Sequence, residues 1–351
     1  MASDNNPTRR YAPIRPEWLA MRIEPIIEPE RAIVDSHHHL WDHPGNRYLL
    51  PEYLADIGDG HNVRATVYAE CGVMHRLDGP VAMKPVGEVE FATSAGKRAA
   101  ESDPTKSICA AIIGGADLRL GGAIEEVLEE MRLASEGRLR GIRNTAAWHS
   151  DPDVRPASNP PEGLLRDPKV REAVSRLPSF GLSFDAWAYH TQMSEVLDIA
   201  RSFPDLTIVI DHIGGALAIG PYRGKRAEVF SVWSEAIAEL AREPNVYLKF
   251  GGLGMRVAGF DFHELDRPPS SKFLAESWRP YFETCLESFG ASRCMFESNF
   301  PVDKGMFSYA VLWNAFKRLA AGYSEAEKDA LFLGSAASVY RLSETEVLRR
   351  A

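Results

Sequence analysis

Residues 32–40 read AIVDSHHHL, an apolar run that leads into three consecutive histidines. Successive side chains of a β-strand point to opposite faces, so His37 and His39 share one face and His38 takes the other. Seven further short runs of β-branched or apolar residues follow along the chain. They span residues 63–72, 107–118, 139–148, 181–189, 206–215, 245–254 and 292–300. Most are almost continuously apolar, which is typical of parallel strands covered on both faces.

Segments with helical periodicity separate these runs. In residues 121–137, apolar positions recur at spacings of three and four beside a Glu-rich outer face, and the pattern stops at Gly137. Residues 191–203 and 225–243 repeat the pattern. Residues 324–342 open with Ser324 and Glu327 at capping-box spacing, which predicts a closing helix.

This alternation predicts an α/β fold, a (β/α)8 TIM barrel with long loops after its strands. We expect residues 1–31 to form an N-terminal extension and residues 32–351 a single catalytic barrel domain. A doubly wound sheet is built from the same units. The glycines of GGADLRLGG (114–122), however, lack the GxGxxG spacing of a dinucleotide site.

The composition is that of a soluble globular protein, and it narrows the classes of partner. A net charge of -9 and the lack of a Lys/Arg-rich block argue against a nucleic-acid surface. No apolar run approaches the ~18 residues of a membrane span, and no secretory signal opens the chain, so we expect a cytoplasmic protein. The four cysteines are far apart and are interpreted as reduced core residues. The oligomeric state stays open, a homo-oligomer included.

In a TIM barrel, catalytic groups come from the carboxyl ends of several strands. The polar residues at the ends of the runs are His37, His39, Glu70, Arg143, Asp185, Tyr189, His190, His212, Lys249, Glu297 and Asn299. A histidine pair two residues apart, with a third at another strand end, favours a metal site over hydrogen-bonded core histidines. His38 is expected in the core. Long insertions at 73–85, 156–163 and 255–271 follow strands and should lie over the mouth of the site.

Four stretches resemble one known family. VDSHHHLW (34–41) is similar to the DxHxHxW opening of the amidohydrolase superfamily, and FPDLTIVIDHIGG (203–215) to the sixth-strand motif of its amidohydrolase-related (type 2) branch. VYLKFGGL (246–253) and CMFESNFPVD (294–303) resemble the seventh and eighth strands of that branch. The match runs from about residue 32 to 342. Within the branch, residues 182–205 are most similar to the lactonase subgroup, whose members open sugar, muconate and pyrone lactones.

The resemblance implies roles for four residues. His37 and His39 would be the metal-binding pair of the first strand. His212 would either bind the same metal or contact an oxygen of the substrate. Arg143 would hold a carboxylate or carbonyl group of the substrate, with a salt bridge at the barrel rim as the alternative.

One position departs from the family pattern. The branch usually ends its eighth strand with SDxP, where the Asp binds metal and takes the proton of the attacking water, but here Asn299 stands in its place. An amide cannot act as a general base. Glu297 has the same strand parity and is the preferred replacement, with Asp303 in the loop as the other candidate. Asn299 could donate a hydrogen bond to a developing oxyanion.

Four further residues complete the candidate site. His190 and Tyr189 follow the fifth strand, and either could contact substrate. Trp148 could wall the pocket, although aromatic packing beneath loops is the commoner fate. Lys249 is expected to pair with a carboxylate, Glu297 being one choice, rather than to act as a nucleophile.

We therefore predict a hydrolase that opens a cyclic ester, a small-molecule substrate, with an activated water. The predicted cofactor is a divalent metal, zinc first, with a metal-free site as the alternative. Two other functions fit the pattern. One is a zinc-dependent decarboxylase of an unsaturated or aromatic acid, and the other is a binding homologue that has lost catalysis through Asn299.

Overall fold

Eight parallel strands form the central sheet in the order β1-β4-β5-β6-β7-β8-β9-β10. The computed structural model describes residues 11–156 and 158–347. The strands are β1 (Ala32–His38), β4 (Asn62–Ala69), β5 (Ser107–Gly115), β6 (Leu139–Thr145), β7 (Ser183–Trp187), β8 (Ile208–Ile210), β9 (Val246–Phe250) and β10 (Cys294–Phe296). Each lies within one or two residues of a predicted run, or inside it. The eight predicted strands are confirmed.

The last strand meets the first through the residues that follow β10. His38 pairs with Phe300 in a parallel bridge, the amide of His39 donates to the carbonyl of Phe300 at 2.8 Å, and that of Asn299 donates to the carbonyl of His37 at 2.9 Å. These bonds bring the ends of β1 and β10 together. The sheet is therefore a nearly closed barrel, and the predicted (β/α)8 TIM barrel is confirmed.

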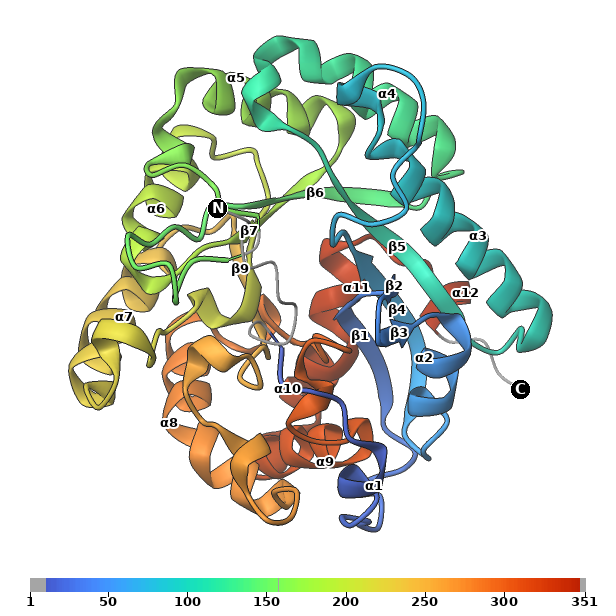
Figure 1. The fold of residues 1–351 in the computed structure, drawn as a ribbon, viewed down its shortest axis with the longest axis vertical. Helices are drawn as coiled ribbons and strands as arrows, with labels where there is room; N and C mark the ends of the chain where they lie inside the picture. Colours follow the sequence, from blue (N-terminus) through green and yellow to red (C-terminus); the bar gives the residue numbers. More distant parts are fainter. Residues whose placement is uncertain (1–10, 157, 348–351) are drawn as a thin grey trace.

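Helices surround the barrel (Figure 1). They are α3 (Val86–Ser102), α4 (Ile124–Ala134), α5 (Pro168–Arg176), α6 (Met193–Ser202), α7 (Arg226–Leu240), α8 (Ser271–Phe289) and α9 (Tyr309–Leu319). The predicted closing helix is confirmed as α10 (Glu325–Asp329), a π-turn over 330–334 and α11 (Ser335–Val339). The predicted capping box of Ser324 and Glu327 is present. Helices such as α4 and α6 bury one apolar stripe, as their periodicity predicts, whereas α9 is buried on most of its surface.

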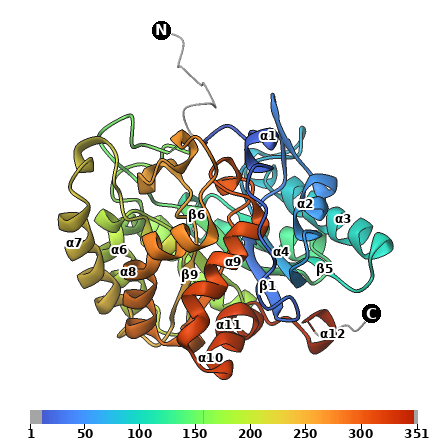
Figure 2. The same ribbon diagram turned by 90° about the horizontal axis from the view of Figure 1, so that it is seen from below.

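The barrel interior is filled by small and branched apolar side chains at the end away from the histidines. One buried cluster joins Val34, Ala65, Ala110 and Met295 of the strands to Tyr340, which follows α11. Val347 of the short helix α12 (Glu344–Val347) belongs to the same cluster. Figure 2 shows α12 at the opposite end of the barrel from α1 (Pro16–Leu19). The C-terminal segment thus plugs this end of the barrel, and the polar site lies toward the other.

The described part of the N-terminal segment packs against the long loop after β9. The indole Nε1 of Trp18 donates to the carbonyl of Leu265 at 3.0 Å, and Nε of Arg22 donates to that of Pro268 at 3.1 Å. Tyr11 stacks on Trp41 of the hairpin β2 (Trp41–His43) and β3 (Asn46–Tyr48), with ring centroids 5.3 Å apart. These contacts hold residues 11–22 beside the barrel, near α2 (Leu50–Ile57). The division into domains at residue 31 stays a prediction.

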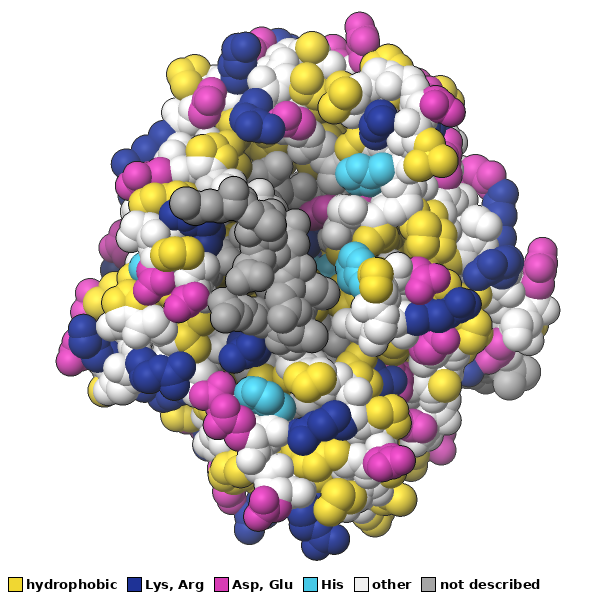
Figure 3. Space-filling view, in the orientation of Figure 1, with side chains coloured by type: hydrophobic (Ala, Val, Ile, Leu, Met, Phe, Trp, Pro, Cys, Tyr) yellow, Lys and Arg dark blue, Asp and Glu magenta, His cyan; other side chains and the backbone are white. Residues whose placement is uncertain are grey.

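The surface mixes charges of both signs on the face shown in Figure 3, where basic and acidic side chains alternate. Across residues 11–156 and 158–347, no helix is long and apolar enough to cross a membrane. All four cysteines are free, and three of them are buried: Cys109, Cys285 and Cys294.

Candidate metal and catalytic centre

The histidines of β1 divide between the barrel interior and its outer wall. His37 and His39 face each other, with their Nε2 atoms 3.2 Å apart, and Nδ1 of His39 lies 2.8 Å from the carbonyl oxygen of Ala69. That oxygen can only accept, so Nδ1 of His39 carries the proton and Nε2 keeps its lone pair. His38 instead contacts the Thr66 hydroxyl at 2.9 Å and stacks on Tyr53. The prediction that His38 is a core residue agrees with these contacts.

His212 enters the centre from the turn that follows β8. Both His212 and Ile213 have positive φ angles, 54° and 53°, which side chains other than glycine adopt at a cost. The indole of Trp233 donates to the carbonyl of Ile213 at 2.7 Å and fixes the turn. Nδ1 of His212 lies 2.7 Å from Oε1 of Glu297, and its backbone amide donates to the same oxygen at 3.1 Å.

Two glycines after β9 make room for this pair. A Cβ on Gly251 would lie 2.3 Å from Cγ of Glu297, and a Cβ on Gly252 would lie 2.5 Å from Cβ of His212. Real Cβ atoms do not approach other atoms so closely. The side chains of Glu297 and His212 can therefore occupy these positions because Gly251 and Gly252 have no side chains there.

These residues fit a divalent cation. One ligand atom each of His37, His212 and Glu297 lie within 4.8 Å of one another, and all three residues are buried. Two imidazole nitrogens bound to one zinc ion lie about 3.4 Å apart at tetrahedral angles, close to the separation of the His37 and His39 Nε2 atoms. Among the described residues, Oε2 of Glu297 has no hydrogen-bond partner, although Nδ1 of His37 lies 3.2 Å away.

The histidines of β1 are held in the neutral form that binds metal. Burial lowers the pKa of His37 well below its usual value, and the charge of Lys249 lowers it further. Burial also lowers the pKa of His39, with the charge of Arg143 as the next cause. A neutral imidazole keeps a lone pair that it can offer to an ion.

A network of buried ion pairs lies beneath the histidines. Nζ of Lys249 lies 2.7 Å from Oδ2 of Asp185 and 3.0 Å from Oδ1 of Asp211. Nε of Arg143 donates to Oδ2 of Asp211 at 2.8 Å. Burial alone would raise the pKa of Asp211, but Lys249, His37 and Arg143 hold it well below its usual range. Lys249 thus pairs with Asp185 and Asp211, and not with Glu297 as one alternative had it.

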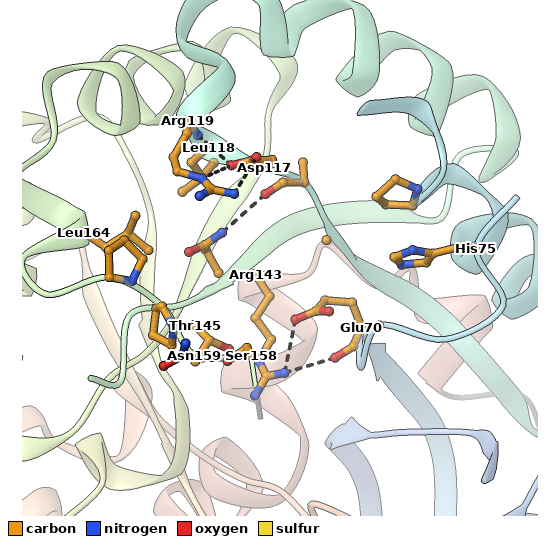
Figure 4. Close-up of a pocket in the computed structure, with 17 residues that line it drawn as sticks. Glu70, His75, Asp117, Leu118, Arg119, Arg143, Thr145, Ser158, Asn159 and Leu164 are labelled. Carbon is orange, nitrogen blue, oxygen red and sulfur yellow. Dashed lines mark hydrogen bonds and ion pairs between the residues drawn. The ribbon is translucent and has the colours of Figure 1, made fainter. Parts of the chain in front are cut away.

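A cavity of about 300 Å³ opens beside Arg143 (Figure 4). Glu70 holds the guanidinium from the end of β4, since Nη1 of Arg143 donates to its carbonyl at 3.0 Å and to Oε1 at 3.3 Å. The walls come from the ends of β4, β5 and β6 and from two of the long loops. The polar lining residues include Glu70, His75, Asp117, Arg119, Arg143, Asn144, Thr145, Ser158 and Asn159. Described residues of the loops 73–85 and 156–163 therefore border the cavity, as expected, whereas the third insertion, 255–271, contributes none of the lining residues.

Asn299 and Asp303 contact each other near the end of β10. Nδ2 of Asn299 donates to Oδ1 of Asp303 at 3.0 Å, and the amide of Gly254 donates to Oδ2 at 2.9 Å. Burial raises the pKa of Asp303 well above its usual value. Of the two candidate carboxylates, Glu297 is the one in contact with the histidines.

Three predicted substrate contacts lie outside this cluster. The hydroxyl of Tyr189 donates to the carbonyl of Val154 at 2.7 Å, and the ring of His190 packs on Tyr222. The backbone of Trp148 is held by the side chain of Gln192, whose Nε2 donates to its carbonyl at 3.0 Å. Their contact with substrate stays a prediction.

Sequence reasoning missed the role of Asp211. It directly precedes His212 and follows an apolar run, so it ends a strand as the chosen candidates do. In a regular strand, Asp211 and His212 would point to opposite faces. Both residues instead lie in the irregular turn after β8, where this alternation does not hold. The hydroxyl of Tyr340 donates to Asp185 at 2.6 Å. Nothing in the sequence was a reason to select Tyr340, because it follows a helix and does not end a strand.

The fold and the centre together define a class: a TIM barrel with buried histidines and a carboxylate at the carboxyl ends of its strands, beside an arginine-lined cavity. The Amidohydrolase family profile matches residues 34–342, and the chain belongs to this family. The resemblance seen in the sequence is thus confirmed.

Similar proteins include lactonases. The uncharacterized protein y4mH of Sinorhizobium fredii is 33% identical over 333 residues, covering 89% of this chain and 99% of its own. An L-fucono-1,5-lactonase of Burkholderia ambifaria is 26% identical over 300 residues, covering 81% of this chain and 86% of its own. A crystal structure of an amidohydrolase from Burkholderia multivorans with bound zinc has a TM-score of 0.65 at 24% identity and covers 89% of this chain and all of that one. This last likeness shows the shared fold.

Proposed function

We propose that the protein is a lactonase that opens a small hydroxylated lactone with water. The observation that carries this proposal is the position of Arg143, which lines the cavity and is held by Asp211, the residue before His212. A substrate in the cavity would thus lie beside the histidine centre. The similarity to L-fucono-1,5-lactonase supports the substrate class.

The cavity suits a small ring that carries hydroxyl groups. Its lining mixes donors such as Arg143 and Asn144 with acceptors such as Asp117 and Glu70. Hydroxyl groups both donate and accept hydrogen bonds, so a sugar lactone can satisfy both kinds of group. A volume of about 300 Å³ is at the lower end for small-molecule sites and favours a monosaccharide over a longer chain.

We propose zinc as the cofactor. His37 and His39 would hold the ion together with Oε2 of Glu297, which has no hydrogen-bond partner among the described residues, and His212 would take the second of its two predicted roles, beside the substrate. A bound zinc ion polarises a carbonyl and lowers the pKa of water. The zinc-bound Burkholderia multivorans amidohydrolase supports this choice of ion. The cytoplasmic location and a homo-oligomeric state stay predictions.

The His212 and Glu297 pair supplies the proton acceptor that Asn299 cannot be. Oε1 of Glu297 accepts from Nδ1 of His212, which leaves Nε2 of the imidazole to face a proton. His212 is 3% exposed and Glu297 is 0% exposed. The histidine is therefore the member of the pair that would contact the water, and the carboxylate behind it orients the imidazole. This arrangement of a base and a residue that orients it serves proton transfer in many hydrolases.

The ring opens in one addition and one elimination. The oxygen of the water bonds to the carbonyl carbon while the pair takes its proton, and Arg143 orients the carbonyl through its guanidinium. The acyl–oxygen bond then breaks. The ring oxygen takes up a proton and becomes a hydroxyl of the open-chain acid, so that the atoms of one water are added.

A screen of lactones tests the function. The zinc-loaded protein is assayed with 1,4- and 1,5-aldonolactones in weak buffer with a pH indicator, and with unsaturated and aromatic acids for release of carbon dioxide. We expect acid release above the spontaneous rate from at least one lactone. Carbon dioxide release without lactone opening would instead identify a decarboxylase. Activity in Asn299→Asp alone would identify a homologue that has lost catalysis.

A further inference from the structure

Asp211 lies between two cations that belong to different parts of the site. Its carboxylate is fully buried, with one oxygen bound by Arg143 and the other by Lys249. Arg143 borders the substrate cavity, and Lys249 lies against His37. A single carboxylate therefore links the arginine of the substrate cavity to the lysine beside the predicted metal ligand His37.

The bond to Arg143 decides which part of the guanidinium faces the cavity. Asp211 takes Nε at 2.8 Å, and Glu70 takes Nη1 through its carbonyl at 3.0 Å. Across the described residues, Nη2 makes no hydrogen bond to the protein. Two fixed bonds on a planar group leave it one orientation, so Asp211 helps to aim the free edge of Arg143.

The ion pair between Asp211 and Lys249 sets the net charge beside His37. Nζ of Lys249 lies 3.0 Å from Oδ1 of Asp211 and 3.2 Å from Nδ1 of His37, and Oδ1 itself lies 3.6 Å from that nitrogen. The ammonium of Lys249 repels a second cation. The negative charge of Asp211 offsets this repulsion where His37 would hold a metal ion.

We propose that Asp211 is a positioning residue that both aims Arg143 at the substrate and keeps His37 able to bind a cation. The inference rests on the proposed function for the part played by Arg143. The part that concerns His37 depends only on metal binding. Asp211 acts through its neighbours and does not itself contact the reacting atoms.

Asp185 offers a matched control within the same network. It is as buried as Asp211 and also pairs with Lys249, at 2.7 Å. The other hydrogen-bond partners of its carboxylate are the hydroxyls of Ser183, at 2.8 Å, and Tyr340, at 2.6 Å, and among the described residues this carboxylate bonds neither the Arg143 nor the His37 side chain. A general effect of removing a buried charge from the barrel would therefore appear in both variants.

The experiment compares Asp211→Asn and Asp185→Asn with the wild type in the full chain. Zinc dissociation constants of the metal-stripped proteins are measured by competition with a fluorescent chelator, and kcat and KM are measured for the lactone. We expect Asp211→Asn to weaken zinc binding about tenfold or more, as changes behind metal ligands do. KM should rise by more than kcat falls. Asp185→Asn should weaken zinc binding by less than Asp211→Asn does, because its carboxylate neutralises Lys249 but bonds neither His37 nor Arg143, and it should leave KM close to the wild-type value.

Equal weakening of zinc binding in the two variants would overturn the proposal, as would an unchanged Asp211→Asn. Asp211→Glu keeps the charge and moves it by one methylene, so it provides a second test if the asparagine variant does not fold. We expect this variant to raise KM while zinc affinity falls less than in Asp211→Asn, and wild-type values for both would contradict the inference. If no lactone is opened, zinc affinity alone decides, and failure of the proposed function is seen separately.

Discussion

Nδ1 of His212 and Oε1 of Glu297 lie 2.7 Å apart, although 85 positions separate the two residues in the chain. The ends of β8 and β10 bring them together, and Gly251 and Gly252 at the end of β9 leave the space that they occupy. In the proposed mechanism this pair takes the place of the strand-end aspartate that the chain lacks at Asn299. The proposed chemistry depends on it.

Glu297→Gln should lower kcat strongly with little change in KM. The amide can still accept from Nδ1 of His212, but it no longer stabilises the positive charge that the imidazole gains with a proton. Loss of acid–base catalysis of this kind is typically 10²–10⁴-fold. Steady-state kinetics with Asp303→Asn as the comparison check the assignment. A larger loss in Asp303→Asn than in Glu297→Gln would reverse it.

Arg143→Lys should raise KM for the lactone by about 10–100-fold. A lysine cannot reproduce the fixed planar edge, and a hydrogen bond from a charged group is worth ~1.5–3 kcal/mol. Arg119→Lys is the control, since Arg119 lines the same cavity but pairs with Asp117 at its exposed rim. Equal changes in KM for the two variants would show that Arg143 has no special contact with the substrate.

Gly252→Ala should destabilise the fold and the centre together. Gly252 has a φ angle of 66°, and an added Cβ would lie 2.5 Å from Cβ of His212. We expect a loss of roughly 1–3 kcal/mol in the free energy of unfolding, measured by denaturant titration. Gly322→Ala is the control, because nothing lies within 4 Å of the position that a Cβ would take there. A neutral Gly252→Ala would mean that the turn of His212 can shift freely.

His37→Ala should abolish stoichiometric zinc binding, whereas His190→Ala should retain it. His37 lies within the cluster of ligand atoms, and His190 packs on Tyr222 outside it. Elemental analysis of the purified proteins gives the metal content, and added zinc should raise the Tm of the wild type, since a ligand of the folded state stabilises it. Zinc retained in His37→Ala would place the ion elsewhere.

The contribution of Glu88 to the stability of the wild type should fall as the pH rises from about 4.5 to about 7. Burial, helped by the charge of Glu70, raises the pKa of Glu88 to about 7 from an ordinary value of 4.5. The folded state then binds the proton more tightly than the unfolded state, so this contribution is complete below pH 4.5 and is lost through pH 7. The effect is of order 3 kcal/mol.

Glu88→Gln should remove that contribution, because the amide does not ionise, so its stability relative to the wild type should rise between pH 4.5 and pH 7. Urea titrations at several pH values measure the free energy of unfolding of each variant. Glu90→Gln, which lies on the same helix with an exposed side chain, should keep the slope of the wild type. A slope in Glu88→Gln equal to that of the wild type would assign the pH dependence to other groups.

Much of the fold could be predicted because the strands of a barrel are buried on both faces and appear as apolar runs. The division of His37 and His39 from His38 follows from strand period alone. The partners of Arg143 and Lys249 could not be predicted, because strand periodicity does not say which side chains from neighbouring strands meet. Asp211 was missed since the turn after β8 departs from regular strand geometry, with His212 and Ile213 at positive φ.

Opening of a sugar lactone in ¹⁸O-labelled water, followed by mass spectrometry of the product acid, tests most directly whether water attacks the acyl carbon at this centre. We expect one labelled oxygen per turnover, located in the carboxylate of the acid. Label in the hydroxyl that derives from the ring oxygen, or no opening of any lactone by the zinc-loaded protein, would contradict the account.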